Sequence, residues 1–382
     1  DLFGPKWIGR PLADDALQQI VAFGHGYVAA ETADGYSDGA IAALCRSTGA
    51  KHAAVVHSYA GAIWLAIAAL AGSKEVLIGR SEVVDIEPGC SLAELTASAG
   101  AVLREVGAVN RASSADYETA ASDRSAAILS SAPETHCLIG ETQTVELDEL
   151  VAVARDRELP LIDALGSAPL VDDLPTVEDS LRSAAASIAA GANLVVLRGD
   201  GLVGGPRCGL LLGDRDLLRR IARHPMFAAW HADVLTLAAL EATLELYDDR
   251  QRLQFAAPLF QLLTTSVENL RHRAERLAPQ LAQAADVSSA DVVATESRLG
   301  VVGGRVYSLP SFGVALLSEN VEALDTRLRS EARPIIGRLD NGRLLLDLRS
   351  VFPRDDRWIV TVLVGSDSAA NREESSQPVG GA

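Results

Sequence analysis

Lysine is the scarcest charged residue of this 382-residue chain. Only Lys6, Lys51 and Lys74 are present, and no lysine follows residue 74. A lysine amine is the side chain that forms an imine with a carbonyl compound. Beyond residue 74 the chain therefore has no side chain for that chemistry.

Other absences narrow the class of protein. No run of basic residues occurs and the net charge is −17, which argues against a nucleic-acid surface because phosphate contacts need clustered Lys and Arg. The most apolar run, residues 60–71, is too short to cross a bilayer and predicts a buried helix. We therefore expect a cytoplasmic protein without nucleic-acid or membrane partners.

Cysteine is also sparse. Its four positions, Cys45, Cys90, Cys137 and Cys208, are far apart and form no C-x-x-C pattern. Dispersed cysteines are typical of buried thiols in a reducing compartment. The sequence therefore predicts neither a metal site nor a catalytic thiol.

Short β-rich runs alternate with helical runs through the first part of the chain. This alternation predicts an α/β domain with a mostly parallel sheet covered by helices on both faces. The predicted strands are 52–56, 75–78, 127–129, 136–139, 160–163, 194–197 and 208–212. The predicted helices are 14–22, 38–47, 61–71, 92–106, 145–156, 176–190 and 214–224.

From residue 233 the pattern changes to long helices and then to strands at 290–296, 313–317, 334–339 and 343–347. Residues 354–364 fit either a helix or a strand. We expect an N-terminal arm at 1–25, a large domain at 26–238, and a long helix with a small α+β domain at 239–365. The polar residues 366–382 predict a disordered tail.

The segment from Arg198 to Pro206 reads Arg-Gly-Asp-Gly-Leu-Val-Gly-Gly-Pro. It resembles the active-site loop Ser-Gly-Asp-Lys-Leu-Leu-Gly-Gly-Pro of the selenocysteine synthase (L-seryl-tRNA selenium transferase) family. In that family the lysine holds pyridoxal phosphate (PLP) as a Schiff base. The lysine position is Gly201 here, directly after Asp200, and glycine has no side chain to form that bond.

Six further segments resemble the same family. They are Val-Gly-Ala-Val-Asn-Arg at 106–111 with Asp-Tyr-Glu at 116–118, Asp-Ala-Leu-Gly-Ser at 163–167, the helical run at 235–244, and the small-domain segments at 308–311 and 342–349. The resemblance implies a fold-type I, aspartate-aminotransferase-like domain with a seven-stranded sheet. It also implies a homodimer or higher homo-oligomer with contacts through the arm and the helix after Asp233.

The resemblance also assigns the cofactor site. Asp163 would pair with the pyridinium nitrogen of PLP, and the turn Ser58-Tyr59-Ala60 would hold the phosphate at a helix start. Gly204 and Gly205 would let the backbone approach that phosphate, and Arg198 would line the pocket. From the residues alone, the structural interpretation is favoured at each position: Asp163 caps the next turn, the Ser58 turn is one that occurs in many α/β folds, and the Gly-Gly pair is a tight turn. The substrate pocket would contain His57, Asn110, Arg111 and His231.

Several family positions have changed together. A threonine pair appears as Ala108 and Val109, and two arginines ahead of the long helix appear as Ala228 and His231. Arginine is a fixed cation suited to phosphate or carboxylate, so anionic ligands lose support. We also expect the family's N-terminal tRNA-binding domain to be missing.

Three hypotheses follow. In the first, the chain is a catalytically degenerate paralogue that acts as a binding, scaffold or regulatory subunit, alone or with an active paralogue. In the second, it is an active transferase or lyase on a small amino-acid-like substrate, with noncovalent PLP or a partner's lysine. In the third, Arg198, Asp200, His57, Tyr59 and His231 form a new polar site for a different reaction. The first is favoured, because an isolated lysine change would not explain the other substitutions.

Overall fold

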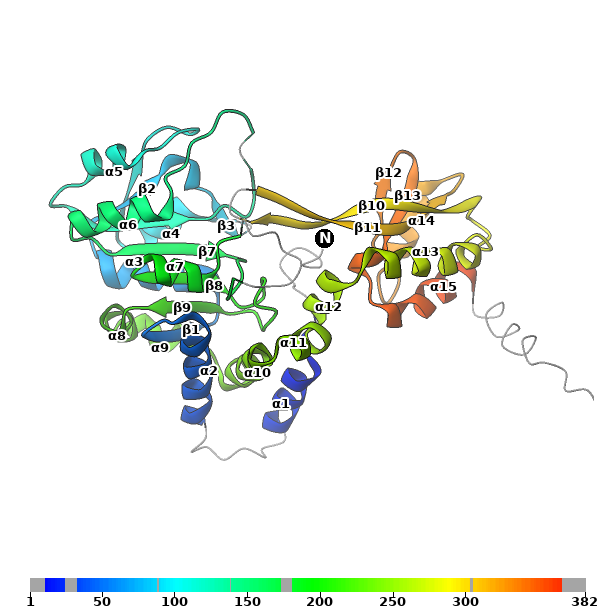
Figure 1. The fold of residues 1–382 in the computed structure, drawn as a ribbon, viewed down its shortest axis with the longest axis horizontal. Coiled ribbons are helices and arrows are strands. Elements are labelled where there is room, and N and C mark those ends of the chain that lie inside the picture. The colour runs from blue at the N-terminus through cyan, green and yellow to red at the C-terminus, as the bar shows by residue number, and fades with distance from the viewer. Residues whose placement is uncertain are drawn as a thin grey trace, which may run out of the picture. The chain divides into compact units, whose positions relative to one another are not determined.

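The computed structural model describes residues 11–24, 33–87, 89–137, 139–172, 181–302 and 305–365. They form two compact units, each considered by itself. The large unit contains the described residues up to Gln261 together with 300–302 and 305–307, and the small unit contains Leu262–Leu299 and the described residues from Ser308 onward. Figure 1 gives the element labels used below.

A seven-stranded sheet forms the centre of the large unit, in the order β1-β9-β8-β7-β6-β2-β5. The strands are β1 (His52–Val56), β2 (Glu75–Gly79), β5 (Val102–Val106), β6 (Ser125–Ser131), β7 (Leu161–Gly166), β8 (Leu194–Arg198) and β9 (Gly209–Gly213). Every pairing is parallel except those of β9 with β1 and β8. The predicted fold class, with a mostly parallel seven-stranded sheet, is confirmed.

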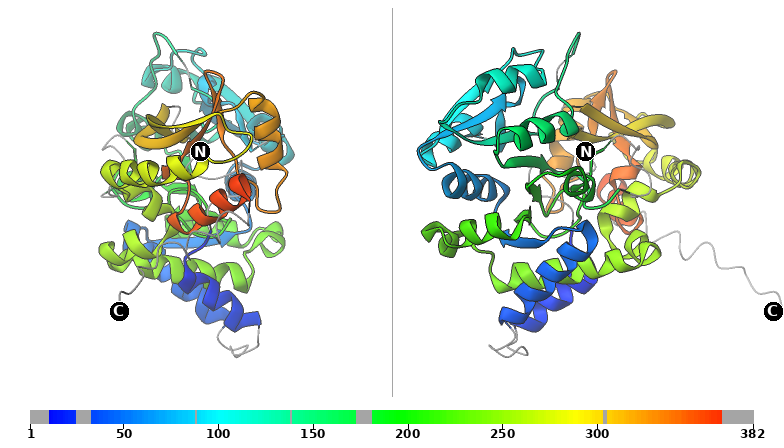
Figure 2. Two further views of the ribbon diagram at one scale, coloured as in Figure 1. Left: turned by 90° about the vertical axis from the view of Figure 1, so that its right-hand side faces the viewer. Right: turned by 60° about the vertical axis from the view of Figure 1, so that its left-hand side comes forward.

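Both faces of this sheet are covered, which explains the nearly continuous apolar runs of its central strands. One face packs against α3 (Tyr59–Ala71), α4 (Leu92–Ser98) and α8 (Arg215–Ala222). The other packs against α2 (Ala33–Thr48), α5 (Ser114–Ala120), α6 (Leu147–Asp156), α7 (Ala184–Ala190) and α10 (Val234–Glu245). Figure 2 draws the same helices and strands from two further directions. The remaining elements are α1 (Asp14–Gly24), which packs on α10, and β3 (Asp85–Glu87), β4 (Cys90–Ser91), α9 (Pro225–Trp230) and α11 (Arg250–Ala256).

Four sequence predictions are wrong in part or in whole. In the described residues the helix expected over 176–190 covers only Ala184–Ala190, and the strand expected at 334–339 begins only at Arg338. The helix expected over 92–106 ends at Ser98, because Gly100 has φ +82° and turns the chain into β5. The strand expected at 136–139 does not form in its described residues, and Ile139 is 94% exposed. Strand β6, which precedes this segment, is already paired with β7 on one side and β2 on the other. Residues 136–139 therefore have no open edge of β6 to pair with.

The small unit has an antiparallel sheet in the order β10-β11-β13-β12. Its strands are β10 (Ser289–Val302), β11 (Arg305–Leu317), β12 (Arg338–Asp340) and β13 (Arg343–Asp347), although residues 300–302 and 305–307 are counted with the large unit. Its helices are α13 (Val267–Leu281), α14 (Val321–Arg329) and α15 (Asp356–Val364). Helix α12 (Pro258–Thr264) contains the point at which the two units join. The ambiguous segment 354–364 is thus mainly helical, and the predicted tail 366–382 lies outside the described residues.

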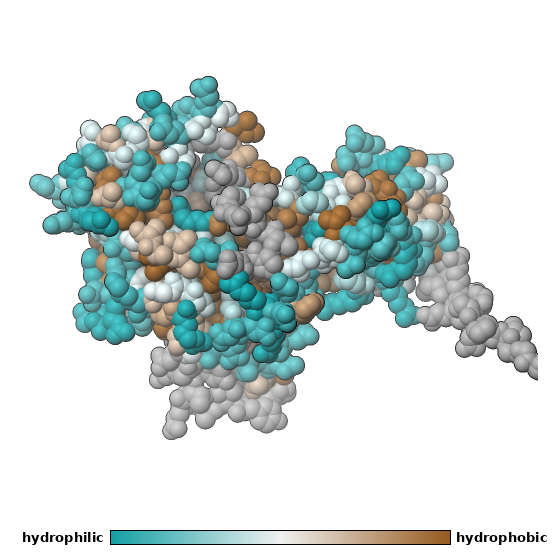
Figure 3. All heavy atoms as spheres, in the orientation of Figure 1, coloured by the Kyte–Doolittle hydropathy of each residue, from teal (hydrophilic) through white to brown (hydrophobic). Residues whose placement is uncertain are grey.

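Hydrophilic and hydrophobic residues are interspersed on the face drawn in Figure 3. Within the described ranges, no helix combines the length and apolarity that crossing a membrane requires.

Candidate functional site

The loop with the lysine-to-glycine change follows β8, at the carboxyl-terminal edge of the parallel strands. Its glycine amides bond within the loop: Gly204 N donates to Gly201 O (3.0 Å), and Gly205 N donates to Gly199 O (2.9 Å). The Tyr247 hydroxyl donates to Val203 O at 2.9 Å. The amides expected to face a phosphate are therefore used to fold the loop itself.

Gly201 lies directly against Ser167, the residue after β7. A Cβ atom at Gly201 would lie 2.6 Å from the Ser167 Cα and 3.0 Å from its carbonyl oxygen. Ser167 is held on both sides, because its N–H donates to Glu134 Oε1 (2.8 Å) and its carbonyl accepts from Leu202 N (3.0 Å). No side chain fits at this position without a movement of backbone.

The two described lysines lie at the opposite edge of the sheet. Lys51 immediately precedes β1 and Lys74 immediately precedes β2, whereas Gly201 follows β8, which runs parallel to both strands. The Lys51 amine also donates to Asp214 Oδ1 at 2.7 Å. Neither lysine replaces the missing one within this chain.

Arg198, at the end of β8, is 4% exposed and lies among three carboxylates. Its Nε and Nη2 donate to the two oxygens of Asp200 (3.2 and 3.3 Å), and its Nη1 lies 3.9 Å from Glu87 and 4.0 Å from Glu134. Burial raises the pKa of Glu134, and the Arg198 charge lowers it in part. This arginine is therefore committed to acidic groups of its own chain.

Asp163 is fully buried in β7 and already has two donors. Arg182 Nη2 donates to one carboxylate oxygen (2.8 Å), and the Ser187 hydroxyl donates to the other (2.7 Å). Burial raises the Asp163 pKa and the Arg182 guanidinium opposes that rise. The Asp163 carboxylate, which we expect to face a pyridinium nitrogen, is thus already bonded to the guanidinium of Arg182 and the hydroxyl of Ser187.

The expected phosphate turn, Ser58-Tyr59-Ala60, does form the start of α3. The Ser58 hydroxyl accepts from Gly61 N at 3.0 Å and caps the helix. Trp230 covers this first turn: a Cβ atom at Gly61 would lie 2.5 Å from the Trp230 ring. Trp230 also packs against Trp64, with ring centroids 5.1 Å apart.

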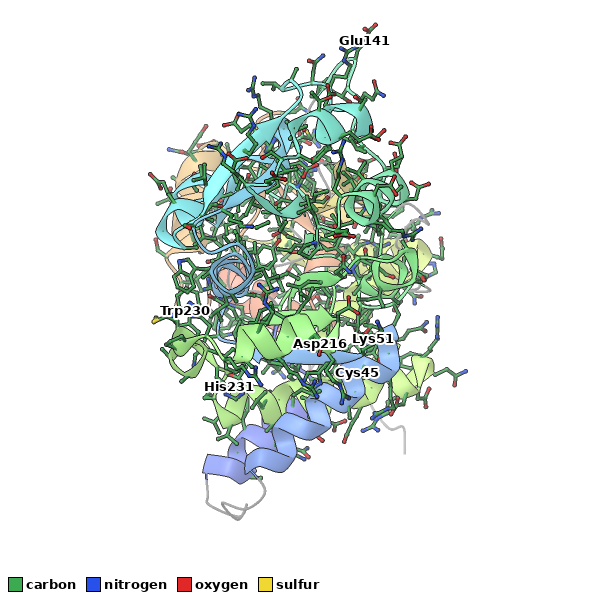
Figure 4. All side chains as sticks on the ribbon, turned by 90° about the vertical axis from the view of Figure 1, so that its left-hand side faces the viewer. Cys45, Lys51, Glu141, Asp216, Trp230 and His231 are labelled. Atoms are coloured by element: carbon green, nitrogen blue, oxygen red, sulfur yellow. The ribbon has the colours of Figure 1, made fainter. Side chains whose placement is uncertain are left out.

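The other predicted pocket residues lie in two further places. His57 and His231 are backbone neighbours, because His57 N donates to Trp230 O (2.9 Å), and Figure 4 shows His231 beside Trp230. The His57 Nδ1 lies 3.7 Å from Asp233 Oδ2.

Asn110 and Arg111 occupy the turn after β5, the last strand of the sheet, where Asn110 Nδ2 donates to Glu141 O. The third hypothesis places five residues in one new polar site. Three of them, Tyr59, Arg198 and Asp200, lie around Glu134, whereas His57 and His231 do not.

Sequence reasoning missed four charged residues at this edge: Glu82, Glu87, Glu134 and Arg182. Glu82 follows β2 and Glu134 follows β6, and strand-end position was the one signal that pointed to them. Among the described residues, no cluster of three or more His, Cys, Asp or Glu side chains is arranged to hold a metal ion.

Glu82 is expected to make stability depend on pH. Burial, followed by the charge of Asp163, raises its pKa from 4.5 to about 8, although Ser131 N donates to its carboxylate at 2.8 Å. The folded chain therefore binds this proton more tightly than the unfolded chain. The contribution is complete below the unfolded pKa and is lost as pH rises through about 8.

Glu82→Gln should therefore flatten the fall in stability between mildly acidic and alkaline pH. The check is the urea midpoint at about pH 5 and about pH 9. Exposed Glu118→Gln is the control and should keep the parent's slope. An unchanged slope in Glu82→Gln would contradict the assignment.

Sequence comparison decides the family. Residues 12–352 match the family SelA: L-seryl-tRNA selenium transferase. This chain belongs to the SelA family. Two of its similar relatives are the L-seryl-tRNA(Sec) selenium transferases of Klebsiella pneumoniae (38% identical over 82% of this chain and 70% of the relative) and Geobacter sulfurreducens (34% over 84% and 70%). A third, from Geotalea daltonii, is 32% identical over 94% of this chain and 80% of the relative.

Structure comparison gives the same fold. The solved structure of D-glucosaminate-6-phosphate ammonia-lyase matches 95% of this SelA-family chain and 93% of its own, with a TM-score of 0.67 and 19% identity. The fold is that of fold-type I PLP enzymes, and PLP is the cofactor of the family. A lysine-bound PLP does not fit the described residues of this chain, because Gly201 lies against the Ser167 backbone and neither Lys51 nor Lys74 is on that edge.

Proposed function

We propose that this SelA-family chain does not carry out Schiff-base PLP chemistry and acts as a binding, scaffold or regulatory subunit. The observation that carries the proposal is the contact between Gly201 and Ser167, which leaves no volume for any side chain at the lysine position. A loop that had lost only its lysine would keep the space the lysine had filled. Here the neighbouring backbone takes that space.

The charges at this edge support the same conclusion. Asp200, Glu134 and Glu87 surround Arg198, and Asp163 is bonded to Arg182 and Ser187. An anionic cofactor would have to compete with these carboxylates for the two guanidinium groups. We infer that the ion pairs now hold the strand ends together and have replaced the interactions of a cofactor.

The partner that we propose is a second copy of this chain or an active paralogue of the same family. Fold-type I sites lie at subunit interfaces, so a chain without the lysine could still complete the site of a chain that has it. The helices that we expect at that contact are α1 and α10, which pack against each other.

A PLP titration tests the proposal. Purified protein is dialysed to equilibrium against increasing PLP, and bound PLP is measured by absorbance, with a SelA-family member that has the loop lysine as the control. We expect the control to develop an imine band and this chain to show no saturable binding. Saturable binding without an imine band would contradict the proposal and favour an enzyme with noncovalent PLP.

A further inference from the structure

A cleft of about 590 Å³ opens on the large unit at the edge of the sheet opposite Gly201. Its walls come from the end of α6, the start of α8 and the residues that precede β1, β7 and β8. Lys51 and Asp216, two of its lining residues, are labelled close together in Figure 4, away from Trp230 and His231. The SelA resemblance assigns nothing to this cleft.

Three cationic side chains line the cleft: Lys51, Arg155 and Arg215. Lys51 is neutralised by Asp214, at 2.7 Å. Arg155 and Arg215 have no hydrogen-bond or ion-pair partner in the part of the chain that the structure describes. In a protein with a net charge of −17, two guanidinium groups without carboxylate partners at one cleft are available to an external anion.

Most acidic residues of the cleft already have a hydrogen-bond or ion-pair partner within the chain. Asp214 also accepts from Asn193 Nδ2 (3.1 Å), and Asp216 pairs with Arg219 (3.3 Å). Glu158 is the remaining carboxylate, and it lies on the exposed turn after α6. The cleft therefore has two uncommitted positive charges against one uncommitted negative charge.

The start of α8 adds to the positive potential. Its N-cap, Asp214, makes no side-chain bond to the helix, so the first-turn N–H groups are not capped by that carboxylate. Helix N-termini stabilise anions through such N–H groups and through the helix dipole. The helix start and both guanidinium groups line the same cleft.

The remaining wall is apolar. Val151 and Ala154 of α6 are buried, and Leu159 and Leu217 are half-buried. An inorganic anion would leave these side chains in contact with water, whereas a ligand with a hydrocarbon part would cover them.

We propose that this cleft binds a small organic anion: Arg155, Arg215 and the first turn of α8 hold its phosphate or carboxylate group, and Val151, Leu159 and Leu217 cover its apolar part. Both acid groups have the bidentate geometry that guanidinium recognises. The site is independent of PLP and of Gly201.

Calorimetric titration with three probes tests the proposal: n-hexyl phosphate, hexanoate and inorganic phosphate. At least one of the two hexyl probes should bind saturably and more tightly than inorganic phosphate, and the tighter hexyl probe identifies the acid group. Arg155→Gln and Arg215→Gln should each weaken it about tenfold or more. Glu158→Gln should tighten it, because a like charge is removed.

Arg223→Gln is the matched control, since Arg223 is the C-cap of α8 and lies outside the cleft lining, and it should bind like the parent. All variants are at exposed positions, and circular dichroism verifies that they fold. The proposal is overturned if neither hexyl probe binds saturably, if inorganic phosphate binds as tightly as they do, or if Arg155→Gln and Arg215→Gln change binding no more than Arg223→Gln.

Discussion

Gly201→Lys is expected to produce a less stable protein that still forms no imine with PLP. The new Cβ atom would lie 2.6 Å from the Ser167 Cα, and Ser167 is fixed by hydrogen bonds to Glu134 and Leu202. Overpacking of this kind costs about 1–3 kcal/mol, and the cost is at the upper end where the obstructing atoms are backbone. The amine would also enter among carboxylates that already have Arg198 as their cation.

The measurement is the urea midpoint together with the visible absorbance after PLP is added. Thr142→Lys, on an exposed stretch, adds the same charge without a steric conflict and should leave the midpoint unchanged. An imine band in Gly201→Lys that is absent from Thr142→Lys, at parental stability, would show that the lysine pocket is intact and would contradict our account.

Arg273→Met is expected to destabilise the small unit by about 3–5 kcal/mol, because it removes the buried guanidinium and leaves the buried carboxylate of Asp356 with only an exposed cation. Arg273 is 8% exposed, and its Nε lies 2.9 Å from both oxygens of Asp356. Its Nη atoms also donate to the carbonyl oxygens of Leu348 (2.9 Å), Val351 (2.7 Å) and Phe352 (3.0 Å). One guanidinium thus connects α13 to the start of α15 and to residues 348–352, the segment between β13 and α15.

Arg276→Met provides the matched control. Arg276 reaches the same Asp356, at 3.0 Å, but its side chain is 65% exposed. We expect a loss below about 1 kcal/mol, as for other exposed ion pairs. Urea unfolding followed by circular dichroism measures both variants, and equal losses would refute the assignment of Arg273 as the buried connection.

The buried strands of the large unit's sheet were predicted well from the sequence. Strand β1 and the central strands β7 and β8 are apolar runs between polar turns, and their positions were found to within a few residues. The segment at 102–106 was misread because an edge strand has one exposed face, and its spacing can be taken for a helix that continues from α4. Gly100 was the local signal for the break.

The sequence predicted which positions form the candidate site. It did not predict which residues contact those positions. Gly201, Asp163 and Ser58 lie at strand or helix ends as expected. The partners that occupy them, Ser167 for Gly201 and Arg182 for Asp163, come from other segments. Such partners depend on tertiary packing, which no local pattern encodes. Two other predicted residues, Asn110 and Arg111, lie after β5, the last strand at one side of the sheet.

The most direct test of the central claim is borohydride reduction of the purified protein with PLP, followed by intact and peptide mass analysis. Borohydride fixes any imine as a stable adduct. Our account predicts that no lysine of the native chain gains the PLP mass beyond the level seen in the urea-unfolded chain. A stoichiometric adduct on Lys51, Lys74 or Lys6 of the folded protein would show that the chain holds PLP covalently and would contradict the account.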